Sequence, residues 1–450
     1  MDYAQRLENV AVLGAAGKMG SGIVLLVAVE MADLGLKPEN KGKKYVLHAV
    51  DVSHAALSGL MKYMREQARK TAEKRIVALR AVYADRPDLV ENRDIIEQYV
   101  SDVLDVIRPV TVLEAACEAN VIFEAVSEDV DLKARLLSRV AADNPRRPWV
   151  FTNTSSVPIE EIDAKARLGG RIMGFHFYNP PAVQKLVELI RGRTTLPEVA
   201  EFAQALTKSL RKTVVPSSDT AGFIGNGHFM RDMLHAIAEA ERLSREMPFV
   251  EAVYAVNRVS QDFLVRPMGI FQLADYVGLD VCQCILRVMD PRLPGQNLRS
   301  PLIDRLLNLG VRGGQNHDGS QKDGFLRYER GKPSGVYDPE GKRYVPVSEF
   351  QAAADARLGP LPEPALAWKA AVRHPAREKV LADFFGKLET LRTPGAELAR
   401  RYGARSRDIG LGLVRDGVAA KAEDVNQVLL TGFFHAYGPI NDYFSEKVVS

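Results

Sequence analysis

The sequence predicts an α/β fold, a Rossmann-type doubly wound and mostly parallel sheet, followed by an all-α C-terminal region with two related helical units. Short apolar runs such as residues 10–13 stop at a glycine or an acidic residue, as strands buried on both faces of a parallel sheet do. Beyond residue 216 the apolar residues recur at helical spacing instead. The predicted domains are 1–215, with a helical insertion at about 54–106, then 216–335 and 336–450.

Composition and charge exclude several classes of protein. The 450 residues are enough for two or three domains, and a formal net charge of +3 gives no reason to expect a nucleic-acid partner. The three cysteines are too few for a disulfide framework, and no metal-ligand spacing is present. The longest apolar run, residues 23–29, is too short to cross a bilayer, and no secretory pattern opens the chain. We expect a cytoplasmic protein without membrane contact.

A glycine-rich turn, GAAGKMGSG, follows the first predicted strand. Gly14, Gly17 and Gly20 permit a tight turn, the approach of a pyrophosphate and close packing of the helix that starts at about Met19. Amides at the start of that helix would bind the phosphates. The G-x-x-G-x-x-G spacing is one residue longer than usual, so another phosphate or an adenosyl ligand is an alternative.

Asp51 ends the second predicted strand, residues 45–50. A carboxylate there can accept hydrogen bonds from both ribose hydroxyls of NAD, and it would repel the 2′-phosphate of NADP. The next three residues include no arginine that could compensate. NAD is therefore the expected cofactor.

Four polar segments carry groups suited to converting an alcohol to a ketone: NTSS (153–156), HFYNP (176–180), KLVE (185–188) and GFIGN (222–226). An imidazole beside a carboxylate accepts a proton near neutral pH, while hydroxyl and amide groups can hold the carbonyl oxygen. A single histidine between apolar neighbours is more typical of a protein core. The four segments in this order favour a catalytic site.

The order and spacing of these segments, after a nucleotide-binding start, resemble the 3-hydroxyacyl-CoA dehydrogenase family over residues 9 to about 328. The resemblance implies NAD-dependent interconversion of (S)-3-hydroxyacyl-CoA and 3-oxoacyl-CoA. On matching positions it implies that His176 is the general base and that Glu188 orients and polarises it. Ser155 and Asn226 would hydrogen-bond the reacting oxygen.

The resemblance also implies contacts with the cofactor and the substrate. Glu128 and Lys133, in SEDVDLK, would line the cofactor, and Asn153 would lie at the carboxyl end of a strand, where ligands of such sheets bind. Asn179 and Lys74 would contact the acyl-CoA. Lys74 belongs to a charged helical stretch that is equally typical of a solvated helix face.

The helical half departs from the family pattern and contains an apparent repeat. Gly225 and Gly227 flank Asn226 where the family has a larger residue and an arginine, and Ser320 replaces a cofactor lysine, with Lys322 close by. RPMGIFQLADYVGLD (266–280) resembles the family's helical signature, and FHAYGPINDYF (434–444) resembles it again. This pattern indicates a degenerate duplication, or else a chance similarity of two short segments. Between the two segments we expect a linker with a hairpin.

The duplication and the departures leave alternatives open. A second helical unit can cover the apolar face that compact family members bury by dimerising, which predicts a monomer with an intrachain pseudo-dimer; a homodimer is the alternative. The substrate could instead be a free hydroxy acid or a cyclic hydroxyacyl-CoA, because the inserted helices and Gly225 alter the pocket. A catalytically lapsed NAD- or CoA-binding scaffold or sensor is an alternative of another class.

Overall fold

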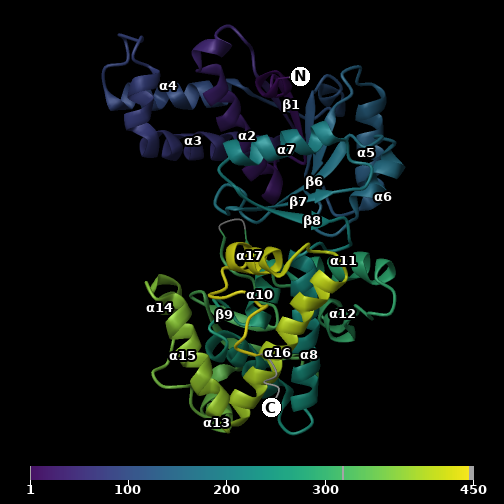
Figure 1. The fold of residues 1–450 in the computed structure, drawn as a ribbon, viewed down its shortest axis with the longest axis vertical. Helices are drawn as coiled ribbons and strands as arrows, with labels where there is room; N and C mark the ends of the chain where they lie inside the picture. Colours follow the sequence, from purple (N-terminus) through teal and green to yellow (C-terminus); the bar gives the residue numbers. More distant parts are fainter. Residues whose placement is uncertain (1, 317–318, 445–450) are drawn as a thin grey trace. The chain divides into compact units, whose positions relative to one another are not determined.

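The computed structural model describes residues 2–316 and 319–444. The chain divides into two compact units, Met1–Asp219 (the first unit) and Thr220–Ser450 (the second unit) (Figure 1). No helix among the described residues is both long and apolar enough to cross a membrane.

The first unit is built on an eight-stranded sheet in the order β3-β2-β1-β4-β5-β6-β7-β8. The strands are β1 Asn9–Leu13, β2 Val46–Val50, β3 Ile107–Val110, β4 Val121–Glu124, β5 Trp149–Thr152, β6 Ile172–Phe177, β7 Leu186–Arg191 and β8 Thr213–Ser218. All neighbouring strands are parallel except β6 and β7, which are antiparallel. The predicted Rossmann-type, mostly parallel sheet is confirmed.

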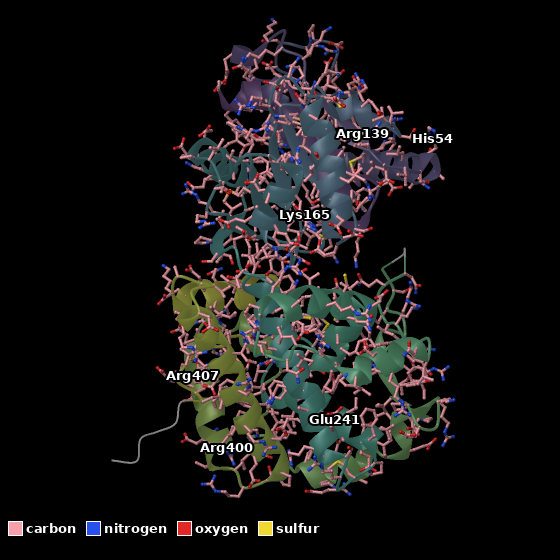
Figure 2. The ribbon with its side chains drawn as sticks, turned by 90° about the vertical axis from the view of Figure 1, so that its right-hand side faces the viewer. His54, Arg139, Lys165, Glu241, Arg400 and Arg407 are labelled. Carbon is pink, nitrogen blue, oxygen red and sulfur yellow. The ribbon has the colours of Figure 1, made fainter. Side chains whose placement is uncertain are left out.

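Helices connect these strands. They are α1 Tyr3–Arg6, α2 Lys18–Gly35, α3 His54–Val82, α4 Asn92–Asp105, α5 Val130–Ala142, α6 Ile159–Ala166 and α7 Pro197–Ser209, with short 3₁₀ turns at Pro38–Asn40 and Leu113–Ala116. Every residue of β4 and β5 is buried, which explains their continuous apolar sequence. Ion pairs such as Lys165–Asp131 (2.6 Å), between α6 and α5, lie on the surface and add little stability (Figure 2).

The helical insertion forms a long antiparallel hairpin of α3 and α4, which lie side by side in Figure 1. The Ser53 side chain caps α3 by accepting a hydrogen bond from the backbone N–H of Ala56. Glu91 and Asp94 cap α4 reciprocally. These caps fix where the two helices begin.

The second unit is mainly helical, as predicted. Its helices are α8 Gly225–Leu243, α9 Phe249–Arg258, α10 Ile270–Val277, α11 Leu279–Met289, α12 Pro301–Asn308, α13 Gln351–Leu358, α14 Trp368–Arg373, α15 Arg377–Thr390, α16 Pro394–Arg415 and α17 Ala422–Gly432. A π-helical turn spans Val259–Phe263, and 3₁₀ turns span Asp290–Arg292 and Val347–Glu349. The predicted division of this region at residue 335 stays a prediction.

The second unit also contains a small sheet, so it is not all-α. Strands β9 Leu326–Glu329, β10 Lys332–Asp338 and β11 Arg343–Pro346 form an antiparallel sheet in the order β11-β10-β9. A hairpin was expected in this part of the chain. The structure adds a third strand to the expected hairpin. The central strand β10 has buried apolar residues, Val336 and Tyr337, that pack into the core, and a third strand pairs with its free edge.

The two similar segments of the helical half have different structures. After Gly269 the first segment forms α10, whose Asp275 accepts hydrogen bonds from the backbone N–H groups of Phe325 (2.6 Å) and Leu326 (2.9 Å). The second segment forms no helix over its described residues and ends in turns, one of them closed by Asn441. The proposed duplication therefore stays a prediction.

A buried ion pair joins separate parts of the second unit. Arg266 donates to Asp232 on α8 at 2.8 Å and to the Ser406 hydroxyl on α16 at 2.9 Å, and Tyr402 of α16 also donates to Asp232. Burial alone would raise the pKa of Asp232, but the positive charge of Arg266 outweighs it and lowers that pKa to about 2. The cluster thus ties α16 to α8 through charged groups.

The Asp232→Asn substitution removes the anion that balances Arg266. Because the folded-state pKa of about 2 lies below the ordinary 3.8, the contribution of Asp232 is complete above about pH 4 and is lost as the pH falls toward 2. We expect the variant to lose about 3–5 kcal/mol of unfolding free energy at pH 7 and to show less pH dependence in that acid range. Urea unfolding across pH 2–7 checks this. Asp416→Asn, at an exposed ion pair, is the control and should change little.

Candidate functional site

The glycine-rich turn joins β1 to α2 and contains two positions that require glycine. Gly14 has a φ of +76°, and a Cβ there would lie 2.7 Å from the carbonyl oxygen of Ala125. A Cβ on Gly20 would lie 2.0 Å from the carbonyl oxygen of Gly14. Gly17, next to the first helical residue Lys18, is less constrained, with 3.2 Å between its Cβ position and the same oxygen. The turn therefore packs closely on the start of α2, as expected of a turn that lets a dinucleotide pyrophosphate approach the helix amides.

Asp51 lies beside this turn, at the carboxyl end of β2. Its Oδ2 accepts a hydrogen bond from the backbone N–H of Ala16 at 2.9 Å, so the carboxylate braces the glycine-rich turn. Asp51 is partly exposed, and the following Val52 is 94% exposed. The carboxylate thus stands where the ribose of a dinucleotide on this turn is expected.

His176 and Glu188 face each other across the antiparallel strand pair of the eight-stranded sheet, β6 and β7. They are direct partners in the register of β6 and β7, and direct partners point to the same face of a sheet. His176 Nδ1 lies 3.3 Å from Glu188 Oε1. His176 is 8% exposed and Glu188 is fully buried. The structure therefore brings together the two residues proposed as general base and orienting acid.

Tyr178 also contacts this pair, and sequence analysis missed it. Its hydroxyl donates to Glu188 Oε1 at 2.6 Å, and its ring centroid lies 4.9 Å from that of His176. Burial first, and the charge of Glu188 second, raise the pKa of Tyr178 well above its ordinary value, so the phenol stays protonated. The available signal was its place two residues after His176, on the same side of an extended chain.

Glu128 anchors the turn that carries Ser155. Its Oε1 accepts hydrogen bonds from residues 154–156: the Thr154 hydroxyl (2.7 Å), the Ser155 N–H (2.8 Å) and hydroxyl (3.2 Å), and the Ser156 N–H (3.0 Å) and hydroxyl (2.9 Å). Burial would raise the pKa of Glu128, but Lys133 and these donors outweigh it and lower the pKa. Glu128 is therefore an anion that fixes the position of the turn that carries Ser155.

Lys133 is buried and contacts Glu128. Its Nζ lies 2.8 Å from Glu124 Oε1 and 3.3 Å from Glu128 Oε2, and Thr152 donates to the other oxygen of Glu124 at 2.6 Å. Burial would lower the pKa of Lys133, but the two carboxylates outweigh it and raise the pKa. Lys133 thus positions Glu128, and its expected direct contact with the cofactor stays a prediction. Sequence analysis missed Glu124 and Thr152, which lie within fully buried strands.

Of the other residues expected to bind ligands in the first unit, Asn153 lies at the carboxyl end of β5. Its Oδ1 accepts a hydrogen bond from the Phe177 N–H at 2.9 Å, which joins the ends of β5 and β6. Asn179, partly exposed, directly follows Tyr178. Lys74 is exposed on α3, while the neighbouring Arg75 turns inward to Asp33. The proposed substrate contacts of Asn179 and Lys74 stay predictions.

Comparisons with known proteins place this site in a family. The model "3-hydroxyacyl-CoA dehydrogenase, NAD binding domain" matches residues 9–220, and "3-hydroxyacyl-CoA dehydrogenase, C-terminal domain" matches residues 222–323. A probable 3-hydroxybutyryl-CoA dehydrogenase of Bacillus subtilis is 31% identical, over 72% of this chain and 98% of its own. The chain belongs to the 3-hydroxyacyl-CoA dehydrogenase family. Its N-terminal match is an NAD-binding domain, so the expected cofactor, NAD, is confirmed.

Other members of the 3-hydroxyacyl-CoA dehydrogenase family resemble the chain over different lengths. A probable 3-hydroxyacyl-CoA dehydrogenase of Caenorhabditis elegans is 29% identical over 70% of this chain and 93% of its own. The structure of FadB2 from M. tuberculosis has a TM-score of 0.55 and 26% identity, covering 72% of this chain and 99% of its own. The 3-hydroxybutyryl-CoA dehydrogenase structure from Escherichia coli has a TM-score of 0.63 and 24% identity, covering 96% and 90%. That last likeness shows a shared fold that extends into the residues beyond 335.

Three residues that depart from the 3-hydroxyacyl-CoA dehydrogenase pattern, Gly225, Gly227 and Ser320, lie in the second unit. Asn226 is the second residue of α8 and is partly buried. A Cβ on Gly227 would lie 3.1 Å from the Leu413 side chain of α16, so a small residue at 227 lets α16 pack closely against α8. The Ser320 carbonyl oxygen accepts a hydrogen bond from the Asn316 N–H at 2.8 Å. The roles of these residues toward ligands stay predictions.

The Gly20→Ala substitution tests the glycine-rich turn. Its Cβ would collide with the Gly14 carbonyl, so α2 must move away from the turn. We expect a loss of about 1–3 kcal/mol in stability and a loss of NADH affinity of about tenfold or more. Fluorescence titration with NADH and thermal unfolding measure the two effects.

Gly59→Ala on α3 is the matched control, because nothing lies within 4 Å of its Cβ position. It should leave NADH affinity unchanged and stabilise the helix by about 0.5–1 kcal/mol. Equal NADH affinity in the Gly20 and Gly59 variants would contradict the assignment of the turn.

Proposed function

We propose that this protein is an NAD-dependent dehydrogenase that interconverts (S)-3-hydroxyacyl-CoA and 3-oxoacyl-CoA. The observation that carries the proposal is the His176–Glu188 pair, which shares one unit with a glycine-rich turn braced by Asp51. The printed names of the relatives, 3-hydroxybutyryl-CoA and 3-hydroxyacyl-CoA dehydrogenases, support the substrate class.

His176 acts as the general base in this proposal. Glu188 faces Nδ1, which favours the tautomer with the proton on Nδ1 and leaves Nε2 to accept the proton of the substrate hydroxyl. The carboxylate then stabilises the imidazolium that forms. In the reverse direction, the imidazolium returns its proton to the oxygen. NAD, when bound, supplies the acceptor for the hydride that leaves the carbinol carbon.

Ser155 and Asn226 hold the reacting oxygen in this proposal, as the resemblance implies. The Ser155 hydroxyl makes the longest of the contacts to Glu128 Oε1, 3.2 Å. The remaining donors from residues 154–156 keep Glu128 and the turn in place when this hydroxyl turns to the substrate. Ser155 can therefore change partner without loss of its position.

The packing of α16 against α8 supports the proposal of a monomer with an intrachain pseudo-dimer. Tyr402 and Arg401 of α16 contact Asp232 and Glu239 of α8, and Leu413 packs at Gly227. The α8 surface is thus covered by a helix from the same chain. A homodimer through another surface is the alternative.

Turnover with defined substrates tests the proposed reaction. Purified protein should oxidise NADH when acetoacetyl-CoA is added, with a marked preference for NADH over NADPH because Asp51 repels a 2′-phosphate. Free acetoacetate should be a poor substrate, and longer 3-oxoacyl-CoAs define the chain-length preference. Turnover of the free acid alone would favour a hydroxy-acid dehydrogenase. Absence of turnover with every substrate, together with normal NADH binding, would favour the scaffold or sensor.

The His176→Gln substitution tests the proposed base. Removing a general base lowers turnover by about a hundred- to ten-thousandfold, and we expect a fall in kcat of that order with NADH affinity unchanged. Steady-state kinetics and NADH titration measure the two quantities. His374→Gln, at an exposed histidine of the second unit, is the control and should keep full activity. Near-normal kcat in the His176 variant would rule out the mechanism.

A further inference from the structure

The side chains of Tyr178 and of the proposed base His176 approach the same carboxylate oxygen of Glu188. Glu188 Oε1 accepts the Tyr178 hydroxyl proton at 2.6 Å and lies 3.3 Å from His176 Nδ1. The tyrosine and histidine rings are 4.9 Å apart with an angle of 41° between their planes. The phenol contact is the shorter of the two and competes with the imidazole for the same oxygen.

We infer that Tyr178 is a positioning residue that acts through Glu188: it fixes the orientation of the carboxylate and limits the charge that Glu188 presents to His176. This inference rests on the proposed function, because it assigns a role within the same proton transfer. Neither the family match nor the resemblance assigns a role to this hydroxyl.

Burial and register support the positioning role. Glu188 is fully buried in β7, so rotation of its carboxylate is opposed mainly by the groups that donate to it. The backbone register fixes where Glu188 lies, whereas the phenol fixes which way its oxygens face. With Tyr178 donating to Oε1, that oxygen stays directed toward β6 and Nδ1.

The effect of a hydrogen bond on carboxylate charge supports the proposal that Tyr178 limits the charge that Glu188 presents to His176. A hydrogen bond to a carboxylate spreads part of its negative charge onto the donor, so the attraction between Glu188 and the imidazolium is weaker than it would be without the phenol. His176 must accept a proton in one direction and release it in the other. A base that is held too strongly as imidazolium would be slow to return its proton.

A titrating lysine, Lys212, lies in the elements next to this strand pair. Lys212, at the start of the turn into β8, donates to the carbonyl oxygens of Pro181 (2.5 Å) and Gln184 (2.7 Å), in the connection between β6 and β7. Burial lowers the pKa of Lys212 to about 8. From β5 and β8, Asn153 and Val215 are the neighbours of this strand pair, and neither titrates.

The Tyr178→Phe substitution tests the inference. In the oxidation of 3-hydroxybutyryl-CoA with NAD, the acid limb of kcat/KM reports the free enzyme's base. Without the phenol, Glu188 presents more charge to the imidazolium, so the limb should move to higher pH by about half to one unit. NADH affinity should not change. An NMR titration of the His176 ring in the same variant measures the shift directly, even if turnover falls.

Tyr254→Phe is the matched control. Tyr254 also donates its hydroxyl to a carboxylate, that of Asp355 at 2.9 Å, but in the second unit between α9 and α13. This variant should show a similar change in thermal stability with an unmoved acid limb. A shift as large in the Tyr254 variant as in the Tyr178 variant would overturn the inference.

The outcomes separate this inference from the proposed function. An acid limb and a His176 titration that stay in place or move to lower pH in the Tyr178 variant overturn the role of Tyr178, provided that His176→Gln is inactive. Near-normal kcat in His176→Gln overturns the proposed mechanism instead, whatever the Tyr178 variant does. An upward shift in both measurements, with an inactive His176 variant, supports both.

Discussion

The antiparallel pairing of β6 with β7 is the constraint on which the candidate site depends. In an otherwise parallel sheet, this single reversal puts His176 directly opposite Glu188. Because side chains alternate along a strand, a shift of the register by one residue would turn Glu188 to the other face and separate the pair. The apolar neighbours of both residues, buried in the core, hold that register. The relative position of the proposed base and its carboxylate is thus set by the backbone pairing of β6 with β7.

A network of buried charged residues holds the neighbouring Ser155 turn in place. Glu124, Lys133 and Glu128 form a chain of ion pairs that ends at the Ser155 turn. Isolated buried charges are costly, whereas a lysine between two carboxylates that also accept hydroxyl and amide donors offsets much of that cost. The network makes the position of Ser155 a property of β4 and α5 as well as of its own turn.

Much of the fold and part of the site could be predicted because local patterns carry them. Glycine spacing and a terminal aspartate predict the nucleotide turn, and the order of the polar segments predicts that His176 and Glu188 form a pair, which the structure brings together. The contact of Tyr178 with Glu188 depends on strand register, which no local pattern specifies. Glu124 reads as an ordinary strand end, and the resemblance places Lys133 at the cofactor; only the three-dimensional arrangement pairs the two residues in the buried interior. Residues 434–444 resemble residues 266–280 but do not form the helix that the first segment forms. Similar residues beside different neighbours fold differently.

The contact at Gly227 affects how the sequence of this protein can evolve. In a symmetric assembly, any substitution appears on both sides of the interface at once, so each surface must remain complementary to itself. Here α8 meets α16, a helix with its own sequence, and the contact of Gly227 with Leu413 involves two independently varying positions. A substitution on one helix can be compensated by a single substitution on the other. The two surfaces are therefore free to specialise, with α8 carrying the segment around Asn226 and α16 supporting that helix.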